Sequence, residues 1–335
     1  MIAFFLAAAI VFSIWASGAI QIRIQARSEQ DAAGQYLVDN TDYVQSGELG
    51  RLGEKVQTYF QPTTLEDYYR LAGTQIGAGE YEAALVSVDT CLELYSGNDE
   101  ALYLDLLLKR GCLHVLLGQY EQAVTALEQV LLTDPEQADA YLVLAQIYSE
   151  IGNYQGLIPV LGEYLKLKPQ DGDIRVVLAQ VLFQLGQYQQ AIAEYEQLKQ
   201  LEDMTESMDQ ILFLESLAYI QLADYAAAKE LLLTISDSEP KILGSDYYLG
   251  VCYLSEEDYE AGETCFTASL EAGEMIQLSS YSRAVCRLMK KDFDYEGALA
   301  DLETAIAYSE ADLDPAITEQ ARGLLDTILT QDTER

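Results

Sequence analysis

Few side chains in this chain of 335 residues have the types and spacing that chemistry requires. There is one histidine, and the five cysteines stand at irregular intervals with no Cys-x-x-Cys pair, at positions 91, 112, 252, 265 and 286. The Cys/His spacing of zinc sites is therefore missing. The sequence also lacks a phosphate-binding loop, a Gly-x-Ser-x-Gly elbow and a His-Glu-x-x-His motif. We predict no catalytic residue, no cofactor, no metal ion and no small-molecule substrate.

The cysteines fit best as core residues, because a free thiol packs like a small hydrophobic group. An alternative is a disulfide between Cys252 and Cys265, which could approach each other if they lie on the two antiparallel helices of one hairpin.

One cluster of basic residues stands out in a chain whose formal net charge is −36. The segment SRAVCRLMKK places Arg283, Arg287, Lys290 and Lys291 at i, i+4, i+7 and i+8, on one face of a helix. A guanidinium group binds a carboxylate through two parallel hydrogen bonds, so this face would suit an acidic segment or a C-terminal carboxylate of a partner. The alternative is internal pairing, for example with the acids of SEADLD at 309–314.

The charge of the whole chain argues against one class of partner. Residues 65–335 carry a net charge of −34, and such a surface repels phosphate backbones, so we predict no binding to nucleic acid. Proline is scarce, with six residues, while Leu, Ala, Glu and Gln are abundant, which favours helices.

The amino terminus is a candidate membrane anchor. Within residues 1–22, the run IAFFLAAAIVFSIWASGAIQI has no charge and as a helix would span about 31 Å, close to the hydrocarbon core of a bilayer. Arg23 and Arg27 follow it directly and no basic residue precedes it, so the positive-inside rule predicts a single-pass protein with its body in the cytoplasm. The alternative is a cleaved signal peptide, with small residues at 16–19, and an extracytoplasmic body.

A short pattern recurs along the rest of the chain. GQYEQAV begins at Gly118 and GQYQQAI at Gly186, and the tyrosine of the pattern recurs at 81, 120, 154, 188, 225, 259 and 295, most often 34 residues apart. The residue nine positions before this tyrosine is always small, and the residue three positions after it is small in all but one copy. Two helices can cross closely only where neither presents a bulky side chain, and glycine ends a helix by adopting a left-handed conformation.

These registered positions resemble the tetratricopeptide repeat family, whose helix–turn–helix unit has a period of 34 residues. The resemblance implies an all-α fold, a right-handed superhelical solenoid of stacked hairpins. We assign residues 23–64 to a linker, 65–312 to seven repeat units and 313–335 to a capping helix and tail. Departures from the family pattern exist: Arg110 and Glu215 replace leucine, and Glu257 and Phe293 replace the turn glycine. His114 stands where other units carry tyrosine, so we interpret it as a packed aromatic side chain.

The resemblance also implies a concave groove lined by the first helix of each unit. The row twelve positions before the tyrosine is Tyr69, Leu108, Leu142, Val176, Phe213, Tyr247 and Arg283. The row eight positions before it is Gly73, Cys112, Gln146, Gln180, Leu217, Val251 and Arg287. These mostly apolar or amide side chains would suit an extended segment or an amphipathic helix, unless they pack against neighbouring hairpins instead.

The sequence therefore predicts a membrane-tethered, non-catalytic scaffold that binds a peptide or protein segment in its groove. The predicted peptide-binding residues are Tyr69, Leu108, Leu142, Gln146, Val176, Gln180, Phe213, Leu217, Tyr247, Val251, Arg283, Arg287, Lys290 and Lys291. Two alternatives remain: a secreted or periplasmic assembly factor with a cleaved signal peptide, and an accessory subunit of an envelope enzyme or secretion complex.

Overall fold

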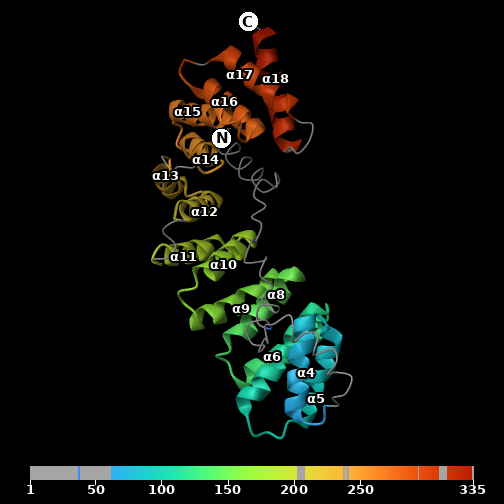
Figure 1. Ribbon diagram of the computed structural model, residues 1–335. Helices are drawn as coiled ribbons and strands as arrows, with labels where there is room; N and C mark the ends of the chain where they lie inside the picture. The colour runs from blue at the N-terminus through green and yellow to red at the C-terminus, as the bar shows by residue number, and fades with distance from the viewer. Residues whose placement is uncertain are drawn as a thin grey trace. The chain divides into compact units, whose positions relative to one another are not determined.

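The computed structural model describes Leu37 and residues 62–201, 208–236, 238, 241–292, 294–308 and 315–333. These residues form fifteen α-helices, α4 to α18, and no strand (Figure 1), so the predicted all-α fold is confirmed. The predicted anchor at 1–22 and nearly all of the linker at 23–64 lie outside the described residues. In the part of the chain that is described, no helix is long and apolar enough to cross a bilayer.

The helices form hairpins, and each registered tyrosine is the first residue of the second helix of its hairpin. The hairpins are α4 (Leu65–Ala78) with α5 (Tyr81–Leu94), α6 (Glu100–Leu116) with α7 (Tyr120–Thr133), α8 (Ala138–Glu150) with α9 (Tyr154–Leu167), α10 (Gly172–Gln184) with α11 (Tyr188–Leu198), α12 (Met208–Gln221) with α13 (Tyr225–Thr234), α14 (Ser245–Ser255) with α15 (Tyr259–Glu271), and α16 (Ile276–Met289) with α17 (Tyr295–Ala307). A final helix, α18 (Pro315–Thr333), follows them.

The described residues fall into two compact units. The N-terminal unit holds Leu37, helices α4 to α9 and α10 as far as Val181; the C-terminal unit begins at Leu182 and holds α11 to α18. Within each unit the second helix of one hairpin packs against the first helix of the next, as α5 does on α6 and α15 on α16. Helix α18 packs on α16 and α17 and buries Ile317, Ala321 and Ile328.

The small registered residues lie where the two helices of a hairpin meet, and the structure buries all of them. A Cβ atom added at Gly111 would come within 2.9 Å of Leu127 Cδ2, and one at Gly250 within 2.7 Å of the buried Phe266 ring. Real Cβ atoms do not approach this closely, so the packing of these helices depends on the missing side chain.

The turn between the two helices of a hairpin requires a left-handed residue. Gly118 has φ 69°, and Glu257, which replaces the turn glycine in its own unit, has φ 63°. The side chain of the next residue, Asp258, accepts a hydrogen bond from the backbone N–H of Ala261, which satisfies a free donor at the start of α15. Ala223, which also stands at the turn position, has φ 58°. Phe293 lies outside the described residues.

A second departure from the family pattern places a carboxylate inside the C-terminal unit. Glu215 is 1% exposed and its Oε2 lies 2.9 Å from the Lys199 Nζ atom, which also pairs with Glu196. Burial raises the pKa of Glu215 to about 6, although the hydrogen bond and the charge of Lys199 act in the opposite direction. The carboxylate therefore costs folding free energy when it is ionised.

We expect opposite effects from two alanine substitutions in the N-terminal unit. Gly118→Ala should lower the free energy of unfolding by about 1 kcal/mol, because alanine must adopt the left-handed conformation although nothing lies within 4 Å of its added Cβ. Gly162→Ala, inside α9 with equally open surroundings, should raise it by about 0.5–1 kcal/mol. Urea unfolding followed by circular dichroism measures both; effects of the same sign would contradict the assigned turn.

Glu215→Leu should stabilise the protein more at pH 7.5 than at pH 5. The pKa of this carboxyl is about 6 in the folded chain against the ordinary value of 4.5, so the folded state holds the proton more tightly. The contribution of Glu215 to stability is therefore complete below pH 4.5 and is lost as the pH rises through 6. Removing the carboxyl should gain about 1 kcal/mol more at the higher pH. An equal gain at both values would show that the Glu215 pKa is not raised.

Candidate functional site

The predicted groove rows of the N-terminal unit come from the first helices of its hairpins. Leu142 and Gln146 on α8, and Val176 and Gln180 on α10, are partly exposed and carry no charge. On α6, Leu108 is buried. The four side chains on α8 and α10 form an uncharged strip that offers apolar contacts and amide groups to a partner. The Gln146 Nε2 atom donates a hydrogen bond of 2.8 Å to Glu150 Oε1.

A polar network joins α4 to α6 in the same unit. The Tyr69 hydroxyl donates a hydrogen bond of 2.9 Å to Asp105 Oδ2. Lys109, whose side chain is 3% exposed, pairs with Asp105, and its Nζ lies 5.2 Å from the centre of the Tyr69 ring. The i, i+4 spacing of Asp105 and Lys109 is visible in the sequence, but the contribution of Tyr69 from the preceding hairpin is not. Tyr69, a predicted peptide-binding residue, is thus held by its neighbours.

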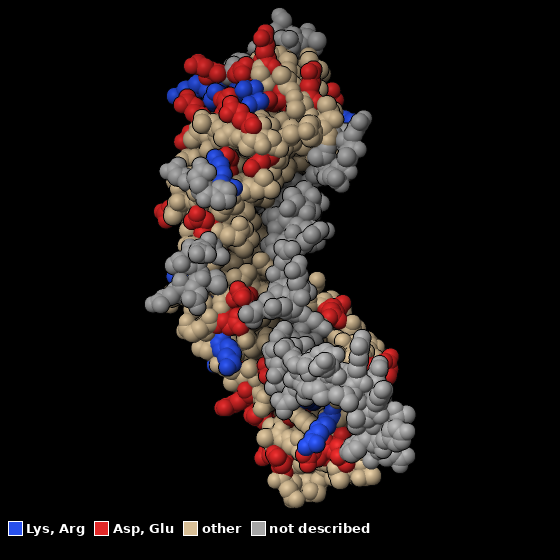
Figure 2. All heavy atoms as spheres, viewed as in Figure 1, with Lys and Arg blue, Asp and Glu red and all other residues tan. Residues whose placement is uncertain are grey.

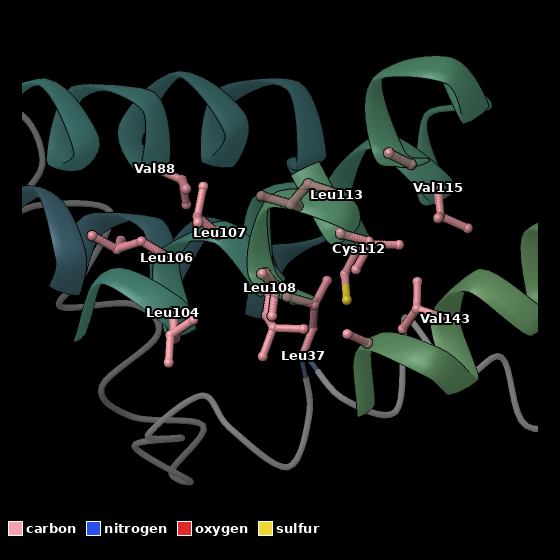
Figure 3. Packing of buried hydrophobic residues seen from close by; sticks show 14 of the residues in the cluster. Leu37, Val88, Leu104, Leu106, Leu107, Leu108, Cys112, Leu113, Val115 and Val143 are labelled. Atoms are coloured by element: carbon pink, nitrogen blue, oxygen red, sulfur yellow. The ribbon is translucent and has the colours of Figure 1, made fainter. Parts of the chain in front are cut away.

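Leu37, which lies outside the repeats, packs among residues of α6 and α8. Leu37 is 1% exposed and belongs to the hydrophobic cluster that contains Leu104, Leu108, Cys112 and Val143. In Figure 3 the Leu37 side chain points toward Leu108 and the sulfur of Cys112. No sequence signal placed Leu37 there, because it belongs to no registered repeat.

In the C-terminal unit the predicted groove residues on α12 and α14 are buried. Tyr247 has no exposed surface, and its ring centre lies 5.8 Å from that of Phe266 on α15. The Phe213 ring meets the neighbouring Tyr248 ring edge-on at 5.8 Å. Leu217 and Val251 are buried as well. These four predicted residues, Phe213, Leu217, Tyr247 and Val251, therefore all contribute to the packing of this unit.

The basic cluster on α16 is engaged by carboxylates of the adjacent helices. Arg283 Nε and Nη2 donate to the two oxygens of Asp301 on α17, at 2.9 and 2.6 Å. Arg287 donates to Asp301 Oδ2 at 3.0 Å and to Glu263 Oε1 on α15 at 2.8 Å. Lys290 also pairs with Glu263. Figure 2 shows acidic and basic side chains close together on the C-terminal unit.

The basic cluster on α16 is therefore paired with acids of its own chain, which the sequence offered as the alternative to binding a partner. Asp301 is only 5% exposed, so its charge depends on the two guanidinium groups. Burial alone would raise the pKa of Glu263, but hydrogen bonds from Arg287 and Lys290 lower it. Lys291 is exposed, and the acids at 309–314 lie outside the described residues. An acidic partner segment would have to displace Glu263 and Asp301 to reach Arg283 and Arg287.

The five cysteines are all free, as expected for core residues, and no disulfide joins Cys252 to Cys265. Burial raises the pKa of Cys91 and Cys265 to about 11 and that of Cys252 and Cys286 to about 12, so these thiols stay protonated near neutral pH.

His114 is buried, with its Nδ1 atom 2.7 Å from Gln119 Oε1. The ring therefore links α6 to the turn before α7. Throughout the described ranges, no three His, Cys, Asp or Glu side chains are grouped so that they could hold a metal ion.

Comparisons with known proteins agree with the repeat architecture. The family model described as anaphase-promoting complex, cyclosome, subunit 3 matches residues 117–198. No curated protein matches the chain. The matched residues span helices α7 to α11, where the chain forms the helix–turn–helix hairpins that the registered residues predict.

Several solved structures are similar to parts of the chain. A tetratricopeptide repeat protein from Parabacteroides merdae shares 14% identity over 79% of this chain and 98% of its own, with a TM-score of 0.43. MamA AMB-1 shares 18% identity over 53% of this chain and 93% of its own, with a TM-score of 0.42. MamA from Desulfovibrio magneticus RS-1 shares 19% identity over 54% and 98%, with a TM-score of 0.41.

Arg283→Gln should destabilise the C-terminal unit by at least about 2 kcal/mol, because it leaves the nearly buried Asp301 with an incomplete set of donors. Arg70→Gln is the matched control, since it breaks an ion pair with Glu66 in which both side chains are more than 70% exposed. It should cost less than about 1 kcal/mol. Equal effects in thermal unfolding would show that the α16 cluster contributes no more than a surface pair.

Proposed function

We propose that this protein is a non-catalytic scaffold that binds a segment of a partner protein on the uncharged strip of the N-terminal unit. Leu142 and Val176 supply apolar contacts, and the amides of Gln146 and Gln180 supply hydrogen bonds to the partner's backbone. The observation that carries the proposal is that these four side chains are partly exposed and uncharged in a chain of net charge −36.

The chemistry of the partner follows from the surroundings of the strip. Acidic side chains dominate the chain, with 55 Asp and Glu against 19 Lys and Arg. A neutral or basic segment with apolar anchors therefore approaches without repulsion, whereas an acidic one is repelled. An acidic segment or a C-terminal carboxylate has a different candidate site at Arg283, Arg287, Lys290 and Lys291. A partner carboxylate binds there only if it replaces Glu263 or Asp301 at the basic side chains. The exposed Lys291 offers the first contact.

The proposal also includes a membrane tether at residues 1–22, supported by the length and the lack of charge of this segment in the sequence. The tether holds the scaffold at the bilayer, with Arg23 and Arg27 on the cytoplasmic side. The alternatives of a cleaved signal peptide and of an accessory subunit of an envelope complex share the same binding strip.

Random peptides displayed on phage test the strip directly. With the full chain as bait in detergent, we expect selected peptides to share apolar anchors and few acids. Leu142→Glu and Val176→Glu should each weaken their binding at least about tenfold, or 1.4 kcal/mol, because each introduces a charge into the strip. Leu132→Glu, at an 85% exposed position on α7, is the matched control and should leave binding unchanged.

Three results would contradict this proposal: no selected peptides, equal loss in the control, or peptides that bind all three variants alike. Mass spectrometry of the amino terminus of the same native preparation separates the tether from a signal peptide. An intact Met1–Ile22 excludes cleavage, and its loss excludes the tether.

A further inference from the structure

A charged side chain, Glu150, stands next to the uncharged strip as the last residue of α8. Leu142, Gln146 and Glu150 follow one another at intervals of four residues, so they lie on one face of the helix. The hydrogen bond of 2.8 Å from Gln146 Nε2 to Glu150 Oε1 shows that the two side chains are neighbours. Because Glu150 is exposed, a partner segment bound on the strip can reach its carboxylate.

Neutral groups hold this carboxylate in place. The Tyr120 hydroxyl, at the start of α7, donates a hydrogen bond of 2.5 Å to Glu150 Oε2, and the Gln146 amide holds the other oxygen. The hydrogen bond to Glu150 raises the pKa of the Tyr120 hydroxyl, so this group stays protonated and donates near neutral pH. A carboxylate that two donors have already fixed loses little conformational freedom when a partner binds it.

Glu150 differs from other carboxylates of the N-terminal unit in its partners. Asp105 pairs with Lys109, and Glu163 pairs with Lys166. Among the residues that the structure describes, no Lys or Arg forms an ion pair with Glu150. A carboxylate oxygen has two lone pairs, so each Glu150 oxygen can accept a further hydrogen bond. The charge of Glu150 can therefore attract a cation of another chain.

The sequence places no other acid at this register. Glu150 stands four positions before the registered Tyr154, and in the other six units the same position holds Gly77, Leu116, Gln184, Gln221, Ser255 and Lys291. The repeat itself therefore does not require an acid at this position. The carboxylate is specific to the hairpin whose first helix carries Leu142 and Gln146.

We propose that Glu150 determines which segments bind the strip, by pairing with a Lys or Arg side chain of the partner. The inference rests on the proposed function, because it takes the same strip and specifies its occupant: a segment with an apolar anchor and one cation at a fixed distance from it. Leu142 and Glu150 are eight residues apart, about 12 Å along the helix axis. An extended segment that lies along α8 covers this distance in about four residues. Tyr120 is a positioning residue, since it acts through Glu150.

Peptide selection on charge variants tests this role. Random peptides on phage are selected in parallel on the full wild-type chain, on Glu150→Lys and on the control Glu128→Lys, which makes the same charge change at an exposed position of α7. We expect the wild type and the control to select Lys or Arg about four positions from an apolar anchor. Glu150→Lys should select Asp or Glu at that position, because its own charge is reversed.

The affinities of one selected peptide then measure the coupling. Replacing its basic residue by Gln should weaken binding to the wild-type chain about threefold, the scale of a single exposed ion pair, and should leave binding to Glu150→Gln unchanged. Tyr120→Phe should reduce this effect, because the carboxylate loses one of the two donors that fix it. Tyr154→Phe, the same change at the registered tyrosine of the next hairpin, should keep the effect.

Selected peptides without a preferred basic position, or the same preference on Glu150→Lys as on the wild type, would overturn the role of Glu150. Either result leaves the strip as the binding surface, because it concerns only the charge beside it. An equal loss on the wild type and on Glu150→Gln would also overturn this role, since the cation would then bind elsewhere on the acidic chain. So would a loss of helicity in both Glu150 variants, measured by circular dichroism. Failure to select any peptide contradicts the proposed function itself, and the role of Glu150 with it.

Discussion

The close approach of the two helices in each hairpin is the constraint on which the structure depends. At Gly111 and Gly250 an added Cβ would collide with the side chains of Leu127 and Phe266, so these side chains occupy the space that a Cβ would need. The left-handed residue at each turn brings the second helix back along the first. Once the hairpins are fixed, first helices of successive hairpins contact each other, as α6 does with α8 and α12 with α14.

Several of the few basic side chains pair with acidic side chains inside the C-terminal unit. In a chain of net charge −36, Arg283 and Arg287 are used to neutralise Asp301 and Glu263 between α15, α16 and α17. Lys199 does the same for the buried Glu215 in α12. Because buried carboxylates need a cation or a proton, three of the 19 basic side chains, Lys199, Arg283 and Arg287, serve the interior of the C-terminal unit. In the N-terminal unit, Leu142, Gln146, Val176 and Gln180 are partly exposed and uncharged.

The groove residues separate into two groups with different physical roles. On α12 and α14 they are buried and stabilise the C-terminal unit, whereas on α8 and α10 they keep exposed surface and can contact another chain. The family pattern assigns both groups to the same rows, because it uses only the distance in sequence from the tyrosine. It does not say which other side chains cover a given position. Leu37 illustrates the difference, since it covers Leu108 and Cys112 from a part of the sequence that carries no repeat.

The sequence by itself determined the hairpins. The tyrosine, the glycine and the small residues recur in register, and each acts through local geometry or through its nearest helix. Their spacing alone therefore predicted a helix–turn–helix unit at each copy, and the structure places the start of the second helix at the tyrosine. Only the tertiary structure decided the partners of the side chains that reach across hairpins, such as Tyr69 with Asp105, Arg283 with Asp301 and Leu37 with Leu108. Such contacts join residues far apart in the chain, and they depend on how one hairpin packs on the next. The hydrophobic periodicity of a single helix does not predict which residues of the next hairpin it will contact.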